Sequence, residues 1–287
     1  MISAKGIQSL FLIIGLCWLP GSAAFAASKP AIAPVLVIVI DDLGDNRGRG
    51  LAAINLKGDI TYAILPHTPH AKTLAKKAHQ LGKEVILHAP MESKSGLRLG
   101  PGALEQHHDS EQLKSILNSD FDSIPFVSGI NNHMGSLLTE DRQKMNDVMG
   151  IVHQRNLFFL DSVTTPKTVA WKVAREHGIP YLLRDVFLDN EQNEEYIHQQ
   201  FKQAVKEATK KGYAVAIGHP YPETIQYLEK ALPIIEQLGV KLISASELIR
   251  LRTGQPLLLA KEQQHPCDQY EGHCPPESVQ PDSANSH

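Results

Sequence analysis

The chain has 287 residues, of which 42% are hydrophobic and 21% are charged, a composition typical of a globular protein with one large core or two small ones. The formal net charge is −3, so the chain lacks the excess of basic residues with which proteins neutralise phosphates. Nucleic acid is therefore not an expected partner.

The first segment has the pattern of a cleaved secretory signal peptide. Lys5 precedes the apolar run LFLIIGLCWLP, and small residues ending in Ala24-Phe25-Ala26 follow it. The run is shorter than the ~20 residues that span a bilayer, which favours a signal peptide over a membrane anchor. We expect residues 1–26 to be removed, residues 27–33 to form a short linker, and the mature chain to be periplasmic or secreted without a stable membrane anchor.

Between residues 34 and 252, apolar runs rich in β-branched residues alternate with polar or helical stretches. Apolar residues at helical spacing predict helices over 71–81, 139–155 and 193–212. Continuous apolar strands separated by helices are typical of a parallel sheet covered by helices. We predict a single-domain α/β fold, a distorted (β/α) barrel of about seven parallel strands. The apolar runs cover 35–40, 60–65, 84–87, 125–130, 157–160, 179–183, 213–217 and 241–245.

The last segment, residues 253–287, turns to Gln, Pro, Ser and His without periodicity, so we expect a disordered tail. Removal of the signal peptide takes Cys17 with it and leaves Cys267 and Cys274. In an oxidising compartment these two cysteines can close a small disulfide loop within the tail.

Histidine, aspartate and arginine side chains follow the predicted strands at the points where the strands end. Because the carboxyl ends of parallel strands meet at the face of a barrel that carries the active site, we expect these side chains to ring that face. Neutral imidazoles with one carboxylate form an open three-ligand zinc site that leaves a position for water. The pattern therefore predicts a divalent-metal site, with Zn²⁺ as the expected ion. The residues are Asp41, Asp42, His67, His88, His133, Asp161, Arg184, Asp185 and His219.

Six motifs make the chain resemble the divergent polysaccharide deacetylase family (YibQ-type). The resemblance covers roughly residues 34–250 and implies a distorted (β/α) barrel related to metal-dependent sugar N-deacetylases of the carbohydrate esterase type. In chain order the motifs are DD (41–42), GKEVILHAPME (82–92), NNHMGS (131–136), FLDS (159–162), RDVFLD (184–189) and IGHP (217–220).

The resemblance also implies roles for individual residues. In the wider superfamily, the first aspartate of the strand-one pair is the general base and the second is a metal ligand, which points to Asp41 and Asp42. His219 matches the histidine that protonates the leaving amine. The superfamily motif of two histidines four residues apart corresponds here to His88 and Glu92, so the second histidine is replaced.

The third metal ligand consequently has two candidates. Either Glu92 binds the metal directly, or His133 completes the site from the position where the superfamily has an arginine and prolines. We favour a site formed by Asp42, His88 and His133 and keep Glu92 as the alternative ligand. The missing arginine helps to position the base in the superfamily, so its absence bears on catalysis.

Four further residues at strand ends are expected to surround these groups. Asp161 or Asp185 is predicted to orient a histidine through a hydrogen bond. His67 and Arg184 are predicted to line the pocket or to contact substrate.

The expected function is that of an exported metal-dependent hydrolase that deacetylates an N-acetylated glycan or a related envelope carbohydrate. The alternative is a catalytically inactive glycan-binding or envelope-interaction protein on the same fold. Asp41 and His219 favour the enzyme, because a binding protein has no use for both a base and an acid. The sequence leaves the oligomeric state open.

Overall fold

The computed structural model of the chain describes residues 33–254. The predicted signal peptide, nearly all of the predicted linker, the pair Cys267 and Cys274, and the predicted tail beyond residue 254 lie outside the described residues. Within the described part of the chain, no helix combines the length and the apolar character that a membrane crossing requires.

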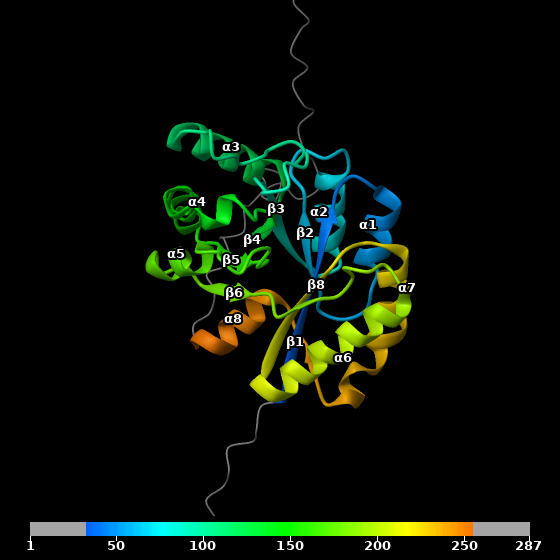
Figure 1. Ribbon diagram of the computed structural model, residues 1–287. Coiled ribbons are helices and arrows are strands. Elements are labelled where there is room, and N and C mark those ends of the chain that lie inside the picture. The colour runs from blue at the N-terminus through cyan, green and yellow to red at the C-terminus, as the bar shows by residue number, and fades with distance from the viewer. Residues whose placement is uncertain (1–32, 255–287) are drawn as a thin grey trace, which may run out of the picture. The chain divides into compact units, whose positions relative to one another are not determined.

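A parallel sheet of nine strands forms the centre of the fold (Figure 1). Its order is β6-β5-β4-β3-β2-β1-β8-β7, and β9 pairs with β1. The edge strands β6 and β7 do not pair with each other within residues 33–254, so the barrel stays incomplete. The strands are β1 (Val35–Leu43), β2 (Thr61–Ile64), β3 (Glu84–Met91), β4 (Val127–Met134), β5 (Phe158–Asp161), β6 (Tyr181–Leu183), β7 (Val186–Phe187), β8 (Tyr213–Gly218) and β9 (Lys241–Leu242).

This architecture confirms the predicted distorted (β/α) barrel. Eight strands overlap the apolar runs of the sequence, and β7 is the addition, since a strand of two residues is too short to produce such a run. Strand β4 continues beyond its predicted end through Asn131, Asn132 and His133 to Met134, because these polar residues pair with the carboxyl half of β3.

Helices cover the outer face of the sheet. The predictions over 71–81 and 193–212 match α2 and α6, and the prediction over 139–155 matches a 3-10 turn followed by α4. Asn193 caps α6 by accepting a hydrogen bond from the N–H of Tyr196, and Gly212 ends the helix at φ +86°, a conformation that favours glycine. The helices are α1 (Arg47–Ile54), α2 (Ala71–Gln80), α3 (Ser110–Ser123), α4 (Arg142–Gln154), α5 (Ala170–Glu176), α6 (Glu194–Lys211), α7 (Pro222–Ala231) and α8 (Ala245–Thr253), with 3-10 turns η1 (Leu138–Glu140) and η2 (Leu232–Leu238).

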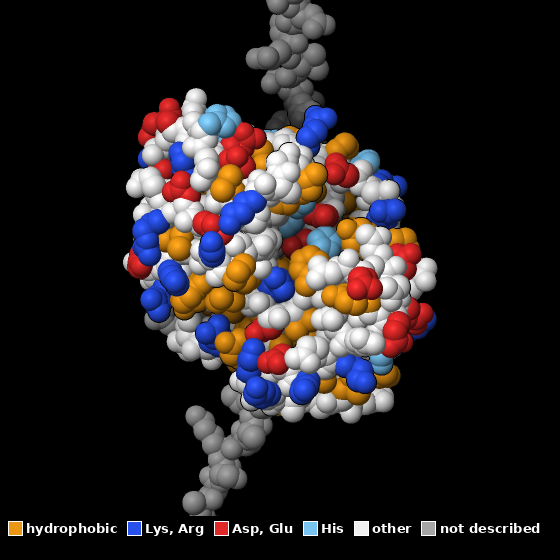
Figure 2. Space-filling view, viewed as in Figure 1, with side chains coloured by type: hydrophobic (Ala, Val, Ile, Leu, Met, Phe, Trp, Pro, Cys, Tyr) orange, Lys and Arg blue, Asp and Glu red, His pale blue; other side chains and the backbone are white. Residues whose placement is uncertain are grey.

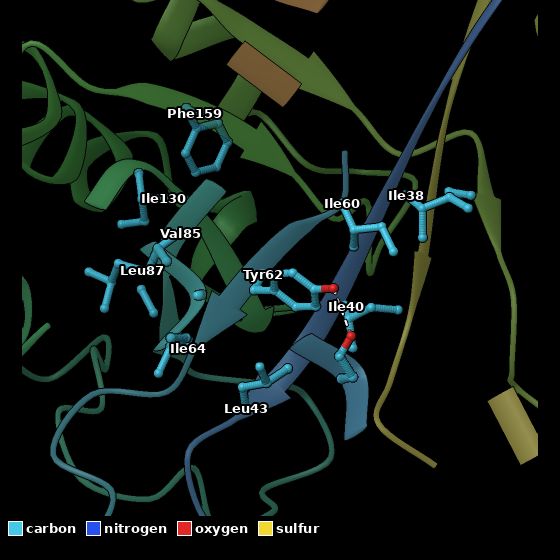
Figure 3. Packing of buried hydrophobic residues seen from close by; sticks show 14 of the residues in the cluster. Ile38, Ile40, Leu43, Ile60, Tyr62, Ile64, Val85, Leu87, Ile130 and Phe159 are labelled. Carbon is cyan, nitrogen blue, oxygen red and sulfur yellow. Dashed lines mark hydrogen bonds between the residues drawn. The ribbon is translucent and has the colours of Figure 1, made fainter. Parts of the chain in front are cut away.

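The larger part of the core lies between the sheet and these outer helices. Alternate residues of β1, including Ile38 and Ile40, pack outward with side chains of the neighbouring strands (Figure 3). Tyr62 is fully buried in this layer, and its hydroxyl donates a hydrogen bond of 2.7 Å to the carbonyl of Ala53.

A second, smaller core fills the inside of the barrel. The other set of β1 residues, including Val37 and Val39, points inward and packs with Leu248 of α8, which lies beside β1 and β6. Gly129 of β4 makes room for the ring of Phe158, since a Cβ at this glycine would lie 2.6 Å from the ring carbons. The barrel interior is therefore a packed core below the site.

Candidate active site and metal centre

Polar side chains complete the inward-facing series of several strands. Since side chains alternate along a strand, Asp41 continues the inward series of Val37 and Val39, and His88 continues that of Ile86. Figure 2 shows histidine and acidic side chains gathered in a hollow of the molecular surface. The residues that follow the inward positions at the carboxyl ends of the strands are Asp41, His88, Asn131, His133, Ser162, Arg184 and His219.

An irregularity in β1 lets two consecutive aspartates reach the same site. Adjacent strand residues normally point to opposite faces, but Asp42 has φ +58° and the pairing register of β1 with β2 slips between Ile40 and Leu43. Such bulges re-aim side chains and occur beside active sites. A non-glycine residue in this conformation costs about 1–3 kcal/mol, which the surrounding fold must supply.

Three potential metal ligands converge at this point. Oδ1 of Asp42 lies 3.1 Å from Nε2 of His88 and 2.9 Å from Nδ1 of His133, and the two ring nitrogens lie 3.1 Å apart. Despite these short distances, Oδ1 of Asp42 is buried and has no hydrogen bond of acceptable geometry. One carboxylate oxygen and two imidazole nitrogens form a donor set that fits Zn²⁺ or a similar divalent cation.

Asn131 connects the aspartate pair to this donor set. Its Nδ2 donates hydrogen bonds of 2.9 and 3.0 Å to the two carboxylate oxygens of Asp41, and its Oδ1 lies 2.8 Å from Nδ1 of His88. An amide oxygen only accepts, so Nδ1 of His88 carries the proton and Nε2 is left free to bind a cation. Asn131 thus fixes the carboxylate and the histidine together.

The pKa values of the two aspartates are shifted in opposite directions. Burial raises the pKa of Asp41, although His88 and His219 oppose that rise. Burial also acts to raise the pKa of Asp42, but His133 and His88 outweigh it and hold this pKa well below its usual range. The two neighbouring carboxyls are therefore suited to different tasks, one to exchange a proton and the other to remain ionised.

His219 faces this pair from the end of β8. Its Nε2 lies 3.8 Å from Oδ2 of Asp42, and its Nδ1 lies 2.9 Å from Oδ1 of Asp189. Burial acts to lower the pKa of His219, but the hydrogen bond that its ring donates to Asp189 and the charge of Asp42 outweigh burial and raise the pKa to about 9. Oδ2 of Asp189 accepts hydrogen bonds from the N–H of His219 and the hydroxyl of Thr224, so this carboxylate is itself held in place.

The carboxylate in contact with the ring of His219 is Asp189, whereas the sequence predicted Asp161 or Asp185 as the carboxylate that orients a histidine. Asp161 points to the outer side of β5, where it accepts hydrogen bonds from the N–H of Val163 and the hydroxyl of Thr168. Asp185 pairs with Lys211 at 2.9 Å and accepts from the N–H of Val215. Side chains alternate between the two faces along a strand, so Asp161 and Asp185 face away from the side that Ser162 and Arg184 occupy.

Glu92, the alternative third ligand, has a different environment. Its Oε2 accepts a hydrogen bond of 2.6 Å from the N–H of Gln106, in the loop between β3 and α3. The group of close donor atoms consists of Asp42, His88 and His133. These contacts favour His133 over Glu92 as the proposed third ligand.

His67 and Arg184 have different environments. Nε2 of His67 lies 3.0 Å from Oδ1 of Asp120 on α3, so its ring contacts a helix rather than the donor set. The Arg184 guanidinium donates to the carbonyls of Ser162 and Val163 and lies 5.1 Å from the ring centroid of Phe187. Arg184 therefore braces the loop after β5 next to His219.

A second group of possible metal donors lies in the loop after β3. It consists of Glu105, His107 and His108. The His107 side chain is 69% exposed, and Nδ1 of His108 already accepts a hydrogen bond from the N–H of Glu105. A neutral imidazole that accepts at one nitrogen carries its proton on the other, so this group fits a cation less well than the donors around Asp42.

The sequence predictions did not include two residues of the candidate site, Asn131 and Asp189. Asn131 could have been found from the two-residue strand period, which places it on the same face as His133. Asp189 follows the short strand β7, and this strand has no apolar run in the sequence from which it could be predicted. Within RDVFLD the spacing alone did not distinguish Asp189 from Asp185.

Comparison with known proteins finds a matching family and two relatives that are similar in sequence. The model of the family described as divergent polysaccharide deacetylase matches residues 38–249. An uncharacterized protein of Escherichia coli (strain K12), YibQ, is 38% identical over 228 residues, which cover 79% of this chain and 71% of that protein. An uncharacterized protein of Haemophilus influenzae is 35% identical over 229 residues, covering 80% of this chain and 79% of that one.

The fold has a counterpart among solved structures. The crystal structure of an uncharacterized protein from Agrobacterium tumefaciens C58 superposes with a TM-score of 0.73 at 22% identity, covering 77% of this chain and 91% of that one. This likeness supports the incomplete parallel barrel. Together with the family match over most of residues 33–254, it allows one conclusion: the chain belongs to the divergent polysaccharide deacetylase family.

Proposed function

We propose that this chain is an exported metal-dependent hydrolase that removes acetyl groups from an N-acetylated glycan or a related envelope carbohydrate. The observation that carries the proposal is the convergence of Asp42, His88 and His133 within about 3 Å of one another, beside a buried aspartate and an oriented histidine. Membership of the divergent polysaccharide deacetylase family supports the same reaction class.

Asp42, His88 and His133 would hold the divalent cation, with Zn²⁺ as the proposed ion. When bound, the cation supplies Lewis-acid activation of the acetamide carbonyl and of a water molecule. Asn131 fixes the side chain of His88 so that its Nε2 faces the other two donors.

Asp41 is the proposed general base. Its buried carboxylate lies 3.7 Å from Nε2 of His88 and is held by two hydrogen bonds from Asn131. It accepts one proton from the water as the oxygen of that water bonds to the acetyl carbon. Asn131 thereby performs the positioning that the superfamily assigns to an arginine.

His219 is the proposed general acid. As the bond between the acetyl carbon and the sugar nitrogen breaks, Nε2 of His219 donates its proton to the departing amine, and acetate is released. Asp189 accepts from Nδ1 and keeps the ring oriented toward the aspartate pair. Arg184 and Phe187 border this side of the site and are proposed to contact the substrate.

The experiment that tests the proposal joins metal analysis to an activity screen. The full chain is purified from its export compartment without chelators, its metal content is measured by elemental analysis, and acetate release is assayed with N-acetylglucosamine oligomers and peptidoglycan fragments. We expect stoichiometric divalent metal and acetate release that a chelator abolishes. A fully metal-loaded chain that binds glycans and releases no acetate would instead be a glycan-binding protein.

Export is tested in the same preparation. Mass spectrometry of the native protein is expected to show a mature chain that begins near Ala27. An intact Met1 on the cell-derived protein would contradict the proposed signal peptide and the periplasmic or secreted location.

A further inference from the structure

A pocket of about 380 Å³ lies between β7 and α6, next to the candidate active site. Its volume falls in the range of small-ligand sites, about 300–1,000 Å³. Phe187 and Arg184 line the pocket, and the ring centroid of Phe187 is 5.2 Å from that of His219. The pocket therefore begins one aromatic ring away from the proposed general acid.

The charged groups of this α6 pocket are already paired. Lys211 lies 2.9 Å from Asp185 and 3.0 Å from Glu207. Arg184 directs two of its donors to backbone carbonyls of the loop after β5. Because the charges are balanced within the pocket, they do not select a strongly charged ligand.

Neutral polar side chains make up the rest of the wall. Tyr196, Gln200 and Gln203 lie at helical spacing on the side of α6 that lines the pocket. Nδ2 of Asn190 donates a hydrogen bond of 3.4 Å to the hydroxyl of Tyr196. Gln200 is half-buried, and its side chain makes no hydrogen bond within the described part of the chain. Neutral donors and acceptors of this kind match the hydroxyl and acetamide groups of a sugar.

We propose that the α6 pocket binds a second sugar unit of the glycan, adjacent to the unit whose acetyl group is removed. The inference rests on the proposed function and extends it, because it assigns the neighbouring sugar unit to a particular pocket beside α6. Gln200 is the residue that supplies unsatisfied hydrogen-bonding capacity to that second unit, with the hydroxyl of Tyr196 beside it.

The test measures binding of N-acetylglucosamine oligomers by isothermal titration calorimetry. Turnover is prevented by the Asp41→Asn substitution in metal-loaded protein, and chelator-treated wild type provides a second non-hydrolysing form. We expect affinity to rise from monomer to trimer, and Gln200→Ala to lower trimer affinity about three- to tenfold through the loss of its hydrogen bonds. Tyr196→Phe should lower it in the same direction.

Gln199→Ala is the matched control. Gln199 is an exposed neighbour on α6 that pairs with Glu195 and does not line the pocket, so trimer affinity should be unchanged. Equal affinities for monomer and trimer, no binding of the trimer, or trimer binding unaffected by Gln200→Ala would each overturn the proposal. Gln200-dependent trimer binding without acetate release by wild type would overturn the hydrolase and leave the pocket assignment intact.

Discussion

Oδ1 of Asp189 lies 2.9 Å from Nδ1 of His219, while Oδ2 of the same carboxylate accepts hydrogen bonds from the N–H of His219 and the hydroxyl of Thr224. Asp189 is fully buried, and its contacts leave the ring of His219 little freedom to rotate. The structure thus joins a residue after β7 to one after β8 in a single hydrogen-bonded unit.

Asp189→Asn tests this unit. Three donors face Asp189, and an asparagine offers only one oxygen with full acceptor capacity, so the amide nitrogen must face a donor or the ring of His219 must turn. We expect kcat to fall by about 10²–10⁴-fold, as for loss of a carboxylate that orients a catalytic histidine. Metal content should remain that of wild type, because Asp189 is no part of the donor set. Unchanged kcat and an unchanged pH profile would show that Asp189 has no such role.

Metal binding separates the two candidates for the third ligand. His133→Ala removes one of three converging donors and should abolish most of the metal affinity. Glu92→Ala leaves all three donors in place and should keep full occupancy, since its carboxylate binds the loop at Gln106. Elemental analysis of both variants after dialysis measures this difference. The reverse pattern, with metal lost from Glu92→Ala alone, would make Glu92 the ligand.

Gly129→Ala tests the packing beneath the site. The added methyl would lie 2.6 Å from carbons of the Phe158 ring inside the barrel, so either the ring or strand β4 must move. Overpacking of this kind costs about 1–3 kcal/mol, to be measured as the change in free energy of unfolding in urea.

Gly150→Ala in α4 is the control for the same substitution. A Cβ at Gly150 meets no atom within 4 Å, and alanine favours a helix over glycine by about 0.5–1 kcal/mol, so this variant should be more stable than wild type. Equal effects of the two substitutions would contradict the packing assigned to Gly129.

Asp120 predicts a pH dependence of stability away from the proposed metal site. Burial raises the pKa of Asp120 to about 8, and Oδ2 has no hydrogen-bond partner. The folded chain therefore holds a proton that the unfolded chain releases near pH 4, so stability is fully present below that pH and falls as the pH rises toward about 8. One such proton contributes a slope of about −1.4 kcal/mol per pH unit.

Asp120→Asn should remove this slope, because the amide does not ionise. Urea unfolding at a series of pH values compares the variant with wild type and with Asp122→Asn, an exposed position of the same helix. Profiles of Asp120→Asn and wild type that run parallel across this pH range would contradict the raised pKa.

The fold was largely predictable because each longer strand contains an apolar run. A strand buried on both faces, such as β1 with Ile38 facing the helices and Val37 facing the barrel interior, leaves a signature in the sequence without any knowledge of pairing. Strand β7 has two residues and leaves no such signature, so the count of strands came out too low.

The location of the site was predictable for the same reason, since strand ends meet at one face. What the sequence did not contain was the backbone conformation of Asp42, whose positive φ arises from the irregular pairing of β1 with β2. Asn131 and Asp189 act through contacts between strands far apart in the chain, and such contacts follow from pairing and register rather than from local spacing.

Asp41 is the proposed general base, beside a metal that its neighbour Asp42 would hold. Asp41→Asn is nearly isosteric and leaves Asp42, His88 and His133 intact, so the variant should fold and keep its metal. Only the proton acceptor is lost, and general-base catalysis is worth about 10²–10⁴-fold, so kcat should fall by that factor with little change in substrate affinity.

The decisive measurement is the rate of acetate release by metal-loaded Asp41→Asn and wild-type chains, on the same N-acetylated oligomer and at equal metal occupancy. We expect kcat of the variant to fall by about 10²–10⁴-fold. Equal rates for the two proteins would contradict this expectation.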